Sequence, residues 1–253
     1  VELLDEGQVQ VVARAVRVGG PAGDAFDVEV FELADRAADS RDTYGGRLWP
    51  AAVFLAGRLA QAGQAVQGRS VLELGAGNGL CSLAAARLGA ASVLATDYRA
   101  LPLALVRRAA AAAGLRVGTE VFDMAAPMPS PLVMSRRNRA ERIAAADGPL
   151  PAHGVLLAAD VGYSTALAWR LGERCRESLA RGGRVLVAES RRMPECRLAF
   201  HEALNRRRAA GDAELRLQPC PFGAASAAAP EDAEGVSRIW FLDAGGADAG
   251  KKK

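Results

Sequence analysis

The chain has 253 residues, enough for one large domain or two small ones with a substantial buried core. Its 32 basic and 29 acidic side chains give a formal net charge of +3, which is too mild to indicate non-specific binding to nucleic acid. Half of the residues are apolar, but Arg107 and Arg108 interrupt the longest apolar run, so we expect no membrane-spanning helix.

The few cysteines and histidines point away from metal or disulfide chemistry. The four cysteines form no C-x-x-C pair, and the two histidines, His153 and His201, are far apart in the chain. This pattern favours free thiols in a reducing compartment over a disulfide framework or a metal site. We therefore expect a soluble monomer without a nucleic-acid or membrane partner, located in the cytoplasm, with the nucleus as the alternative.

The first third of the chain contains short alternating stretches and one amphipathic helix. Residues 8–33 alternate apolar and polar side chains around Gly19-Gly20-Pro21, which predicts a strand pair. Residues 35–46 are polar and rich in turn-forming residues, which indicates a loop. Pro50 suits the first turn of a helix, and apolar residues recur at helical spacing over 51–62. We expect a β extension with a loop over residues 1–46 and the main domain over 47–243.

From Arg69 onward, segments with strand and helix patterns alternate. The expected strands are 71–74, 92–96, 120–122, 154–159 and 183–189. The expected helices are 79–88, 100–113, 165–180 and 194–209. Two final strands, 214–218 and 236–242, follow without a helix between them. The alternation predicts an α/β fold with a doubly wound, mostly parallel sheet, and the last pair predicts an antiparallel hairpin at its edge.

Two segments fall outside this alternation. Residues 127–150 contain several prolines and the basic run Ser135-Arg136-Arg137-Asn138-Arg139. We favour a solvated surface insertion, and a basic lip that contacts an acidic partner is the alternative. Residues 244–253 end in three lysines and are expected to form a disordered tail.

The strand at 71–74 runs directly into a glycine-rich turn, with the sequence V-L-E-L-G-A-G-N-G-L over residues 71–80. Glycine lets the backbone approach a ligand closely. Asp97 closes the next apolar run, where a carboxylate suits the hydroxyl groups of a ribose. The combination predicts a βαβ unit that binds a nucleoside-like ligand.

The turn departs from the dinucleotide-binding pattern G-x-G-x-x-G. Leu80 stands at the position of the third glycine, and the Glu73 carboxylate would be poorly placed beside a pyrophosphate. An acidic strand end suits a cationic ligand better. A site for NAD(P) and a purely structural turn remain the alternatives.

The glycine turn resembles motif I of the class I S-adenosylmethionine-dependent methyltransferases, in which a strand ending in E/D-x-G-x-G-x-G holds the cofactor. Two further motifs resemble the family 16 methyltransferases, a group of seven-β-strand protein-lysine methyltransferases. These are Leu48-Trp49-Pro50 before the turn and Asp160-Val161-Gly162-Tyr163 after the strand at 154–159. The resemblance spans about residues 40–242. It implies a Rossmann-like, seven-stranded sheet and S-adenosyl-L-methionine as the cofactor.

The resemblance also implies contacts between individual residues and the cofactor. Four residues of the turn would contact the methionine part: Gly75, Ala76, Gly77 and Asn78. Glu73 would lie near the amino acid end of the cofactor, and Asp97 would accept hydrogen bonds from the ribose. Trp49 would pack beside the methionine tail, with core packing as an equal alternative, and Tyr98 would stack on the adenine or cap a helix.

A third group of residues follows the later strands. Asp123-Met124 stands where the family often has D-W-G, so Asp123 is expected to bind the adenine amino group although the tryptophan and glycine are missing. Ala159 and Asp160 would flank the cofactor. Asp160 would also orient the acceptor amine and receive a proton indirectly, and Tyr163 would form a wall of the acceptor channel.

The residues between Asp160 and Tyr163 bear on the acceptor. Methyltransferases of nucleotide amino groups carry N/D-P-P-Y here, where prolines and an aromatic ring hold a flipped base. This chain has Val161 and Gly162 instead, which argues against a base and favours a protein lysine. A methyltransferase for a small molecule or another protein atom, and a non-catalytic cofactor-binding protein, remain the alternatives.

Overall fold

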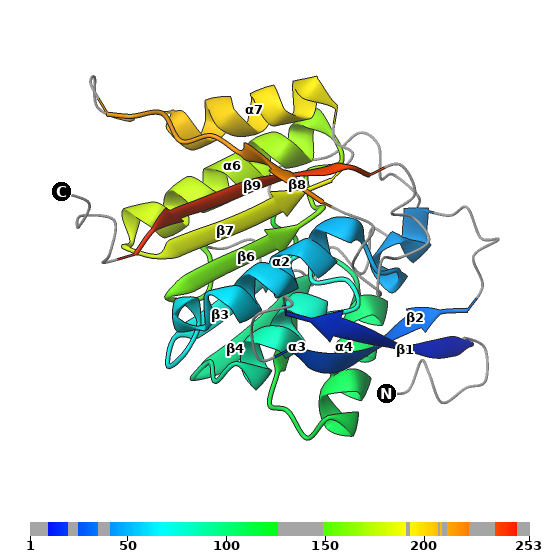
Figure 1. Cartoon of the computed structure of the whole chain (residues 1–253). Helices are drawn as coiled ribbons and strands as arrows, with labels where there is room; N and C mark the ends of the chain where they lie inside the picture. The colour runs from blue at the N-terminus through cyan, green and yellow to red at the C-terminus, as the bar shows by residue number, and fades with distance from the viewer. Residues whose placement is uncertain are drawn as a thin grey trace.

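The computed structural model describes residues 10–19, 25–34, 41–125, 149–190, 193–206, 208, 212–222 and 236–246. Seven strands form one sheet in the order β5-β4-β3-β6-β7-β9-β8. Their bounds are β3 (Ser70–Leu74), β4 (Ser92–Asp97), β5 (Gly118–Val121), β6 (Val155–Ala159), β7 (Arg184–Glu189), β8 (Gln218–Pro221) and β9 (Arg238–Gly245). The first five strands are parallel, and β9 is antiparallel to both β7 and β8. The predicted seven-stranded sheet with an antiparallel hairpin at its edge is confirmed (Figure 1).

Helices cover both faces of the sheet, because the strand side chains alternate between two apolar clusters. On one face, Val71 and Val93 pack in a cluster with α2 (Pro50–Gln61) and α3 (Leu80–Arg87), and α4 (Ala100–Ala112) covers Ala95. On the other face, Leu72 and Leu74 pack with α6 (Thr165–Ala180) and α7 (Pro194–Asn205). Burial on both faces explains why the central strands are nearly continuous apolar runs.

The predicted N-terminal strand pair is also confirmed. β1 (Val11–Val18) pairs antiparallel with β2 (Phe26–Leu33) in a separate two-stranded sheet. Side chains such as Val16 and Val30 pack with α3 and α4, and Figure 1 shows the hairpin on the far side of the molecule from α7. Residues 41–46, expected as a loop, form the 3-10 turn η1 (Arg41–Gly46), and a second short turn, η2 (Gly63–Ala65), follows α2.

Several expected bounds shift. β8 begins where the expected strand 214–218 ends, because two prolines mask the strand pattern at an edge position that tolerates them. α7 ends at Asn205, before the expected residue 209. β9 continues to Gly245, so the first residues of the expected tail are strand. Most of the 127–150 insertion and residues 247–253 lie outside the described residues.

Across the described ranges, none of the helices combines the length and the apolar character that a membrane crossing requires.

Candidate functional site

The glycine turn joins β3 to α3 in a backbone conformation that glycine adopts readily. Gly75, Gly77 and Gly79 have φ angles of 63°, 54° and 80°. A Cβ atom on Gly79 would lie 2.6 Å from a methyl group of Val106 in α4, and one on Gly75 would lie 2.9 Å from a methyl group of Val161. The turn is therefore packed tightly on both sides, and side chains at these glycines would collide with their neighbours.

Asp97, at the end of β4, is hydrogen-bonded to the turn. Its Oδ2 accepts a hydrogen bond from Gly77 N over 3.1 Å, and its Oδ1 accepts one from Arg99 N over 3.1 Å. Burial raises the pKa of Asp97 to about 6, although both hydrogen bonds favour the charged form. The structure thus brings the expected ribose-binding carboxylate into contact with the glycine turn.

Glu73, two residues before the turn, anchors the helix that follows it. Its Oε2 accepts hydrogen bonds from the amide and the hydroxyl group of Ser82, in the first turn of α3. Burial raises the pKa of Glu73 to about 7, the bonds from Ser82 act in the opposite direction, and the nearby charge of Asp97 adds to the increase. Glu73 therefore lies at the base of the turn, where it caps a helix.

Asn78 carries a buried side-chain amide with an unused hydrogen-bond donor. Its side chain is 2% exposed, and Nδ2 has no hydrogen-bond partner among the described residues. An unsatisfied buried donor costs about 1–3 kcal/mol, and a ligand acceptor on the turn would remove that cost. The donor fits the expected contact between Asn78 and the methionine part of the cofactor.

Residues 44–49 lie across the turn, and we refer to them as the 44–49 segment. The carbonyl oxygen of Gly45 would be 3.3 Å from a Cβ atom on Gly77. The Tyr44 carbonyl oxygen accepts a hydrogen bond from Trp49 Nε1 over 3.0 Å, and the centroids of the two rings are 5.8 Å apart. Glu32 of β2 accepts a hydrogen bond from Leu48 N over 2.7 Å, so the N-terminal hairpin fixes this segment in place.

Asp160, which follows β6, is bonded to the start of α2 and the end of β7. It is the one non-glycine residue with a positive φ angle, 55°, in the part of the chain that the structure describes. Its Oδ2 accepts a hydrogen bond from Ala51 N at the start of α2, over 3.2 Å. Its Oδ1 accepts one from Ser190 N, over 2.7 Å, at the end of β7. Such strained conformations persist where the surroundings fix them, and they cluster at functional sites.

The residues expected around the adenine lie at the ends of β4 and β5. Phe122 N donates a hydrogen bond to the Asp97 carbonyl oxygen over 2.9 Å, which brings Asp123 beside the end of β4. The Asp123 carboxylate accepts a hydrogen bond from Ala125 N over 2.9 Å. The ring of Tyr98 lies 5.8 Å from the Arg99 guanidinium group, measured from its centroid.

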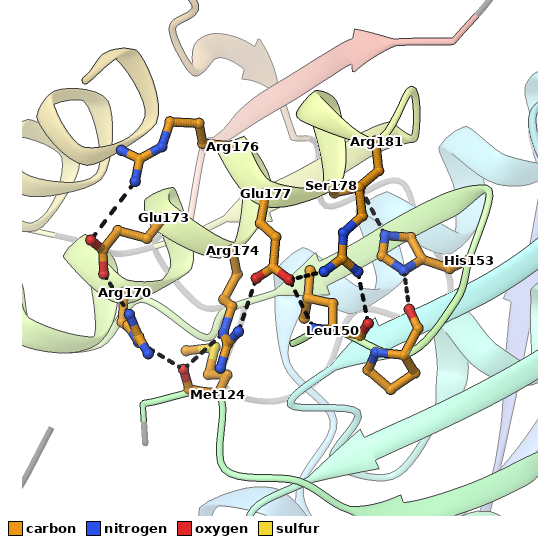
Figure 2. Close-up of polar contacts among 11 residues, drawn as sticks. Met124, Leu150, His153, Arg170, Glu173, Arg174, Arg176, Glu177, Ser178 and Arg181 are labelled. Carbon is orange, nitrogen blue, oxygen red and sulfur yellow. Dashed lines mark hydrogen bonds and ion pairs between the residues drawn. The ribbon is translucent and has the colours of Figure 1, made fainter. Parts of the chain in front are cut away.

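Met124 is held through its backbone. Its carbonyl oxygen accepts hydrogen bonds from Arg170 Nε, over 3.2 Å, and Arg174 Nε, over 3.3 Å (Figure 2). Both arginines belong to α6. The side chain of Met124 is buried, 7% exposed, and packs in the apolar cluster beneath α6 and α7.

All the residues expected at the site lie at the carboxyl ends of β3, β4, β5 and β6 or just before α2, because the carboxyl ends of parallel strands meet at one edge of the sheet. Ala159 is half-buried at the end of β6. Tyr163 is 52% exposed. Sequence reasoning missed Glu32, Glu189 and Ser190, which are buried polar residues at strand ends. Over the described ranges, no three His, Cys, Asp or Glu residues form a group that could hold a metal ion.

Methyltransferases are among the solved structures with similar folds. The 16S rRNA N2 G1207 methyltransferase RsmC from T. thermophilus, solved with AdoMet and guanosine, matches 93% of this chain with a TM-score of 0.51 and 15% identity. SMU.776, solved with SAH, matches 87% of this chain with a TM-score of 0.53 and 16% identity. The chain has the fold of a class I methyltransferase. It spans 51% and 54% of those two chains, respectively.

Comparisons of sequence indicate which group of methyltransferases this chain resembles. The lysine methyltransferase family model matches residues 33–128, which include the 44–49 segment, the glycine turn, Asp97 and Asp123. The protein N-terminal and lysine N-methyltransferase EFM7 from Eremothecium gossypii is 46% identical over 63 residues, which are 25% of this chain and 24% of that protein. The resemblance to lysine methyltransferases is confirmed over this part of the chain. The chain spans about a quarter of the curated relative that it matches.

Proposed function

We propose that the chain is an S-adenosyl-L-methionine-dependent methyltransferase that methylates a lysine side chain of a protein. The observation that carries the proposal is the convergence of three motifs at one edge of the sheet. The glycine turn is bonded to Asp97, Val161 of the D-x-x-Y motif packs on Gly75, and the 44–49 segment lies across Gly77. The match of residues 33–128 to the lysine methyltransferase family supports the same conclusion.

The chemistry of the site suits this cofactor. S-adenosyl-L-methionine supplies an activated methyl group on a sulfonium, and it carries no phosphate. The buried carboxylate of Asp97 is bonded to the glycine turn, where its charge would favour a cationic ligand over the pyrophosphate of a dinucleotide. The unpartnered Nδ2 of Asn78 supplies a donor for its methionine part.

The acceptor amine must lose a proton before it attacks, since the pKa of a free lysine is near about 10.4. Burial next to a cation lowers that pKa. Asp160 is already hydrogen-bonded to Ala51 N and Ser190 N, so its position is fixed before an acceptor arrives. We propose that Asp160 orients the amine and that Tyr163 lines the acceptor channel. Alignment and exclusion of water then supply most of the acceleration.

EFM7 is an N-terminal as well as a lysine N-methyltransferase, which adds a second candidate acceptor, the N-terminal amine of a protein. Both acceptors are primary amines at the end of a flexible chain, a lysine side chain or the N-terminus of a protein. The missing prolines at positions 161 and 162 favour both over a nucleotide base. We further propose that the protein acts in the cytoplasm as a monomer.

Incubation of the purified protein with S-adenosyl-L-methionine labelled on the methyl group and a cell extract tests the proposal. We expect label in a protein band that survives nuclease treatment, and mass spectrometry of that band distinguishes a lysine from an N-terminal amine. Label confined to RNA or to small solutes would contradict a protein acceptor. Calorimetry with the cofactor alone separates loss of binding from loss of transfer, and binding without transfer would indicate a non-catalytic protein.

Asp160→Ala tests the role given to the D-x-x-Y motif. We expect it to abolish methyl transfer while the affinity for S-adenosyl-L-methionine changes little. If transfer and cofactor affinity both stayed at the level of the unchanged protein, the role assigned to Asp160 would be wrong.

A further inference from the structure

β7 ends in two buried polar residues that the sequence did not assign to the site. Glu189 is 4% exposed and Ser190 is 6% exposed, whereas residues 185–188 of the same strand are apolar and buried. Burial of a carboxylate is costly unless hydrogen bonds compensate it. The hydrogen-bond partners of Glu189 and Ser190 therefore show what compensates the burial of these two polar side chains.

Glu189 is bonded to the middle of the D-x-x-Y motif. Its Oε1 accepts a hydrogen bond from Gly162 N over 2.9 Å. A Cβ atom on Gly162 would lie 3.1 Å from that oxygen and 3.4 Å from the carboxyl carbon. Glycine at position 162 thus gives the carboxylate room beside the backbone, and it supplies the N–H that a proline would lack.

Ser190 is bonded to the first residue of the motif. Its amide donates to Asp160 Oδ1 over 2.7 Å, and its hydroxyl group lies 2.8 Å from both carboxylate oxygens. Asp160 N in turn donates to the Ala188 carbonyl oxygen over 2.9 Å. Glu189, the last residue of β7, and Ser190, which follows it, therefore hold Gly162 and Asp160. Tyr163 comes next in the chain and is about half exposed.

We propose that Glu189 and Ser190 are positioning residues for the acceptor. They fix residues 160–163 so that Asp160 and Tyr163 face the acceptor amine in one arrangement. This inference rests on the proposed function and assigns to β7 a part in acceptor recognition. Val161, rather than Glu189 or Ser190, makes the contact between residues 160–163 and the glycine turn. Substitution of Glu189 or Ser190 should therefore affect turnover of the acceptor more than binding of the cofactor.

Glu189→Ala and Glu189→Gln form the matched pair that tests the proposal. The glutamine keeps an oxygen that accepts from Gly162 N, and the alanine removes it. We expect Glu189→Ala to lower kcat/KM for the acceptor about 10- to 100-fold, the range that small misplacements of reacting groups produce, and Glu189→Gln to retain most of the activity. The Kd for S-adenosyl-L-methionine should stay within the error of the unchanged protein in both variants. Equal losses in both variants, full activity in Glu189→Ala, or a parallel loss of cofactor affinity would overturn the assignment.

A measurement that needs no methyl transfer separates this inference from the proposed function. Amide hydrogen exchange at Gly162 should be slow in the unchanged protein and in Glu189→Gln, and faster in Glu189→Ala. Absence of methyl transfer in the unchanged protein would refute the proposed function. Exchange at Gly162 that is equally fast in all three proteins would refute the role of Glu189, whatever the activity.

Gly162→Ala tests the same contact from the other side and serves if Glu189→Ala does not fold. The added methyl group would force the Glu189 carboxylate to shift by a few tenths of an ångström, so we expect a partial loss of acceptor turnover with cofactor affinity retained. In the double variant Gly162→Ala/Glu189→Ala the losses should not add, because both changes act on one contact. Additive losses would contradict the assignment of Gly162 and Glu189 to one shared contact.

Discussion

The Asp97 carboxylate accepts a hydrogen bond from the Gly77 amide over 3.1 Å, so the end of β4 and the glycine turn share one contact. The carbonyl oxygen of Gly45, in the 44–49 segment, packs against Gly77 from another direction. The turn is therefore fixed from two directions that are distant in sequence. A ligand on this turn meets a preorganised backbone, which lowers the cost of ordering the site on binding.

Asp97→Ala should weaken the binding of S-adenosyl-L-methionine. Hydrogen bonds to a charged group contribute about 1.5–3 kcal/mol, which corresponds to a loss of about 10- to 100-fold in affinity. Isothermal titration calorimetry measures the change, and circular dichroism checks that the variant is folded. Asp27→Ala is the matched control, because Asp27 lies in the N-terminal hairpin with an exposed side chain. Equal affinities in the two folded variants would exclude a cofactor contact by Asp97.

Glu73 should make stability fall with increasing pH. Burial raises its pKa from 4.5 to about 7 in the folded protein, so the folded state holds a proton that the unfolded state has released. The stability from this proton is fully present below pH 4.5 and is lost as the pH rises through about 7. Asp97 adds a change of the same sign between pH 3.8 and about 6.

Urea unfolding at a series of pH values between 5 and about 8 measures this dependence. Glu73→Gln cannot titrate, and its side-chain oxygen still accepts a hydrogen bond from the Ser82 amide. We expect a flatter profile for Glu73→Gln than for the unchanged protein, with Asp97 supplying what remains of the slope. Parallel profiles would show that Glu73 stays ionised in the folded state.

Gly79→Ala should destabilise the protein. Its φ angle is 80°, and the new Cβ would lie 2.6 Å from a methyl group of Val106. Strain and overpacking of this kind cost about 1–3 kcal/mol. Gly57→Ala in α2 is the control, because nothing lies within 4 Å of its added Cβ. In a helix interior that change should stabilise by about 0.5–1 kcal/mol. Chemical denaturation compares the two, and a stabilising effect of Gly79→Ala would contradict the observed packing.

The fold was largely predictable because local patterns and packing agree. Both ends of α6 match the prediction, since Ser164 caps the first turn, where its hydroxyl group accepts a hydrogen bond from Leu167 N, and Gly182 and Gly183 follow the last. β8 was placed too early, because Pro219 and Pro221 suppress the strand pattern. The pairing of β8 with β9 at the edge of the sheet matches the predicted hairpin, but the local pattern does not show where β8 begins.

The site was predictable only where a motif carries it. The glycine turn and Asp97 follow one another in a βαβ unit, so their contact could be expected. Glu189 looks like the solvated end of an apolar strand, and only the parallel register of β6 and β7 brings it next to Gly162. Glu32 likewise reaches Leu48 N through the packing of the hairpin. These contacts join residues distant in sequence, and single-sequence patterns do not encode them.

Glu177 of α6 is bonded to Leu150 and pairs with Arg174, whose Nε donates to the Met124 carbonyl oxygen (Figure 2). Its carboxylate accepts hydrogen bonds from Leu150 N over 2.9 Å, from Arg174 over 2.9 Å and from Arg181 over 2.6 Å. Partial burial raises the pKa of Glu177, but these donors outweigh it and the pKa lies below its ordinary value. The stabilising contribution is therefore present above pH 4.5 and is lost as the pH falls further.

Glu177→Ala should lower the free energy of unfolding at pH 7 by at most about 1 kcal/mol, the range for partly exposed ion pairs. Because salt screens such pairs, the difference from the unchanged protein should shrink in about 1 M NaCl. Exchange of the Leu150 amide should become faster, since its acceptor is lost. Glu214→Ala is the control, because Glu214 pairs with Arg216 on an exposed surface and should change neither quantity. A difference in unfolding free energy that does not depend on salt, or unchanged exchange at Leu150, would show that Glu177 does not hold Leu150 in place.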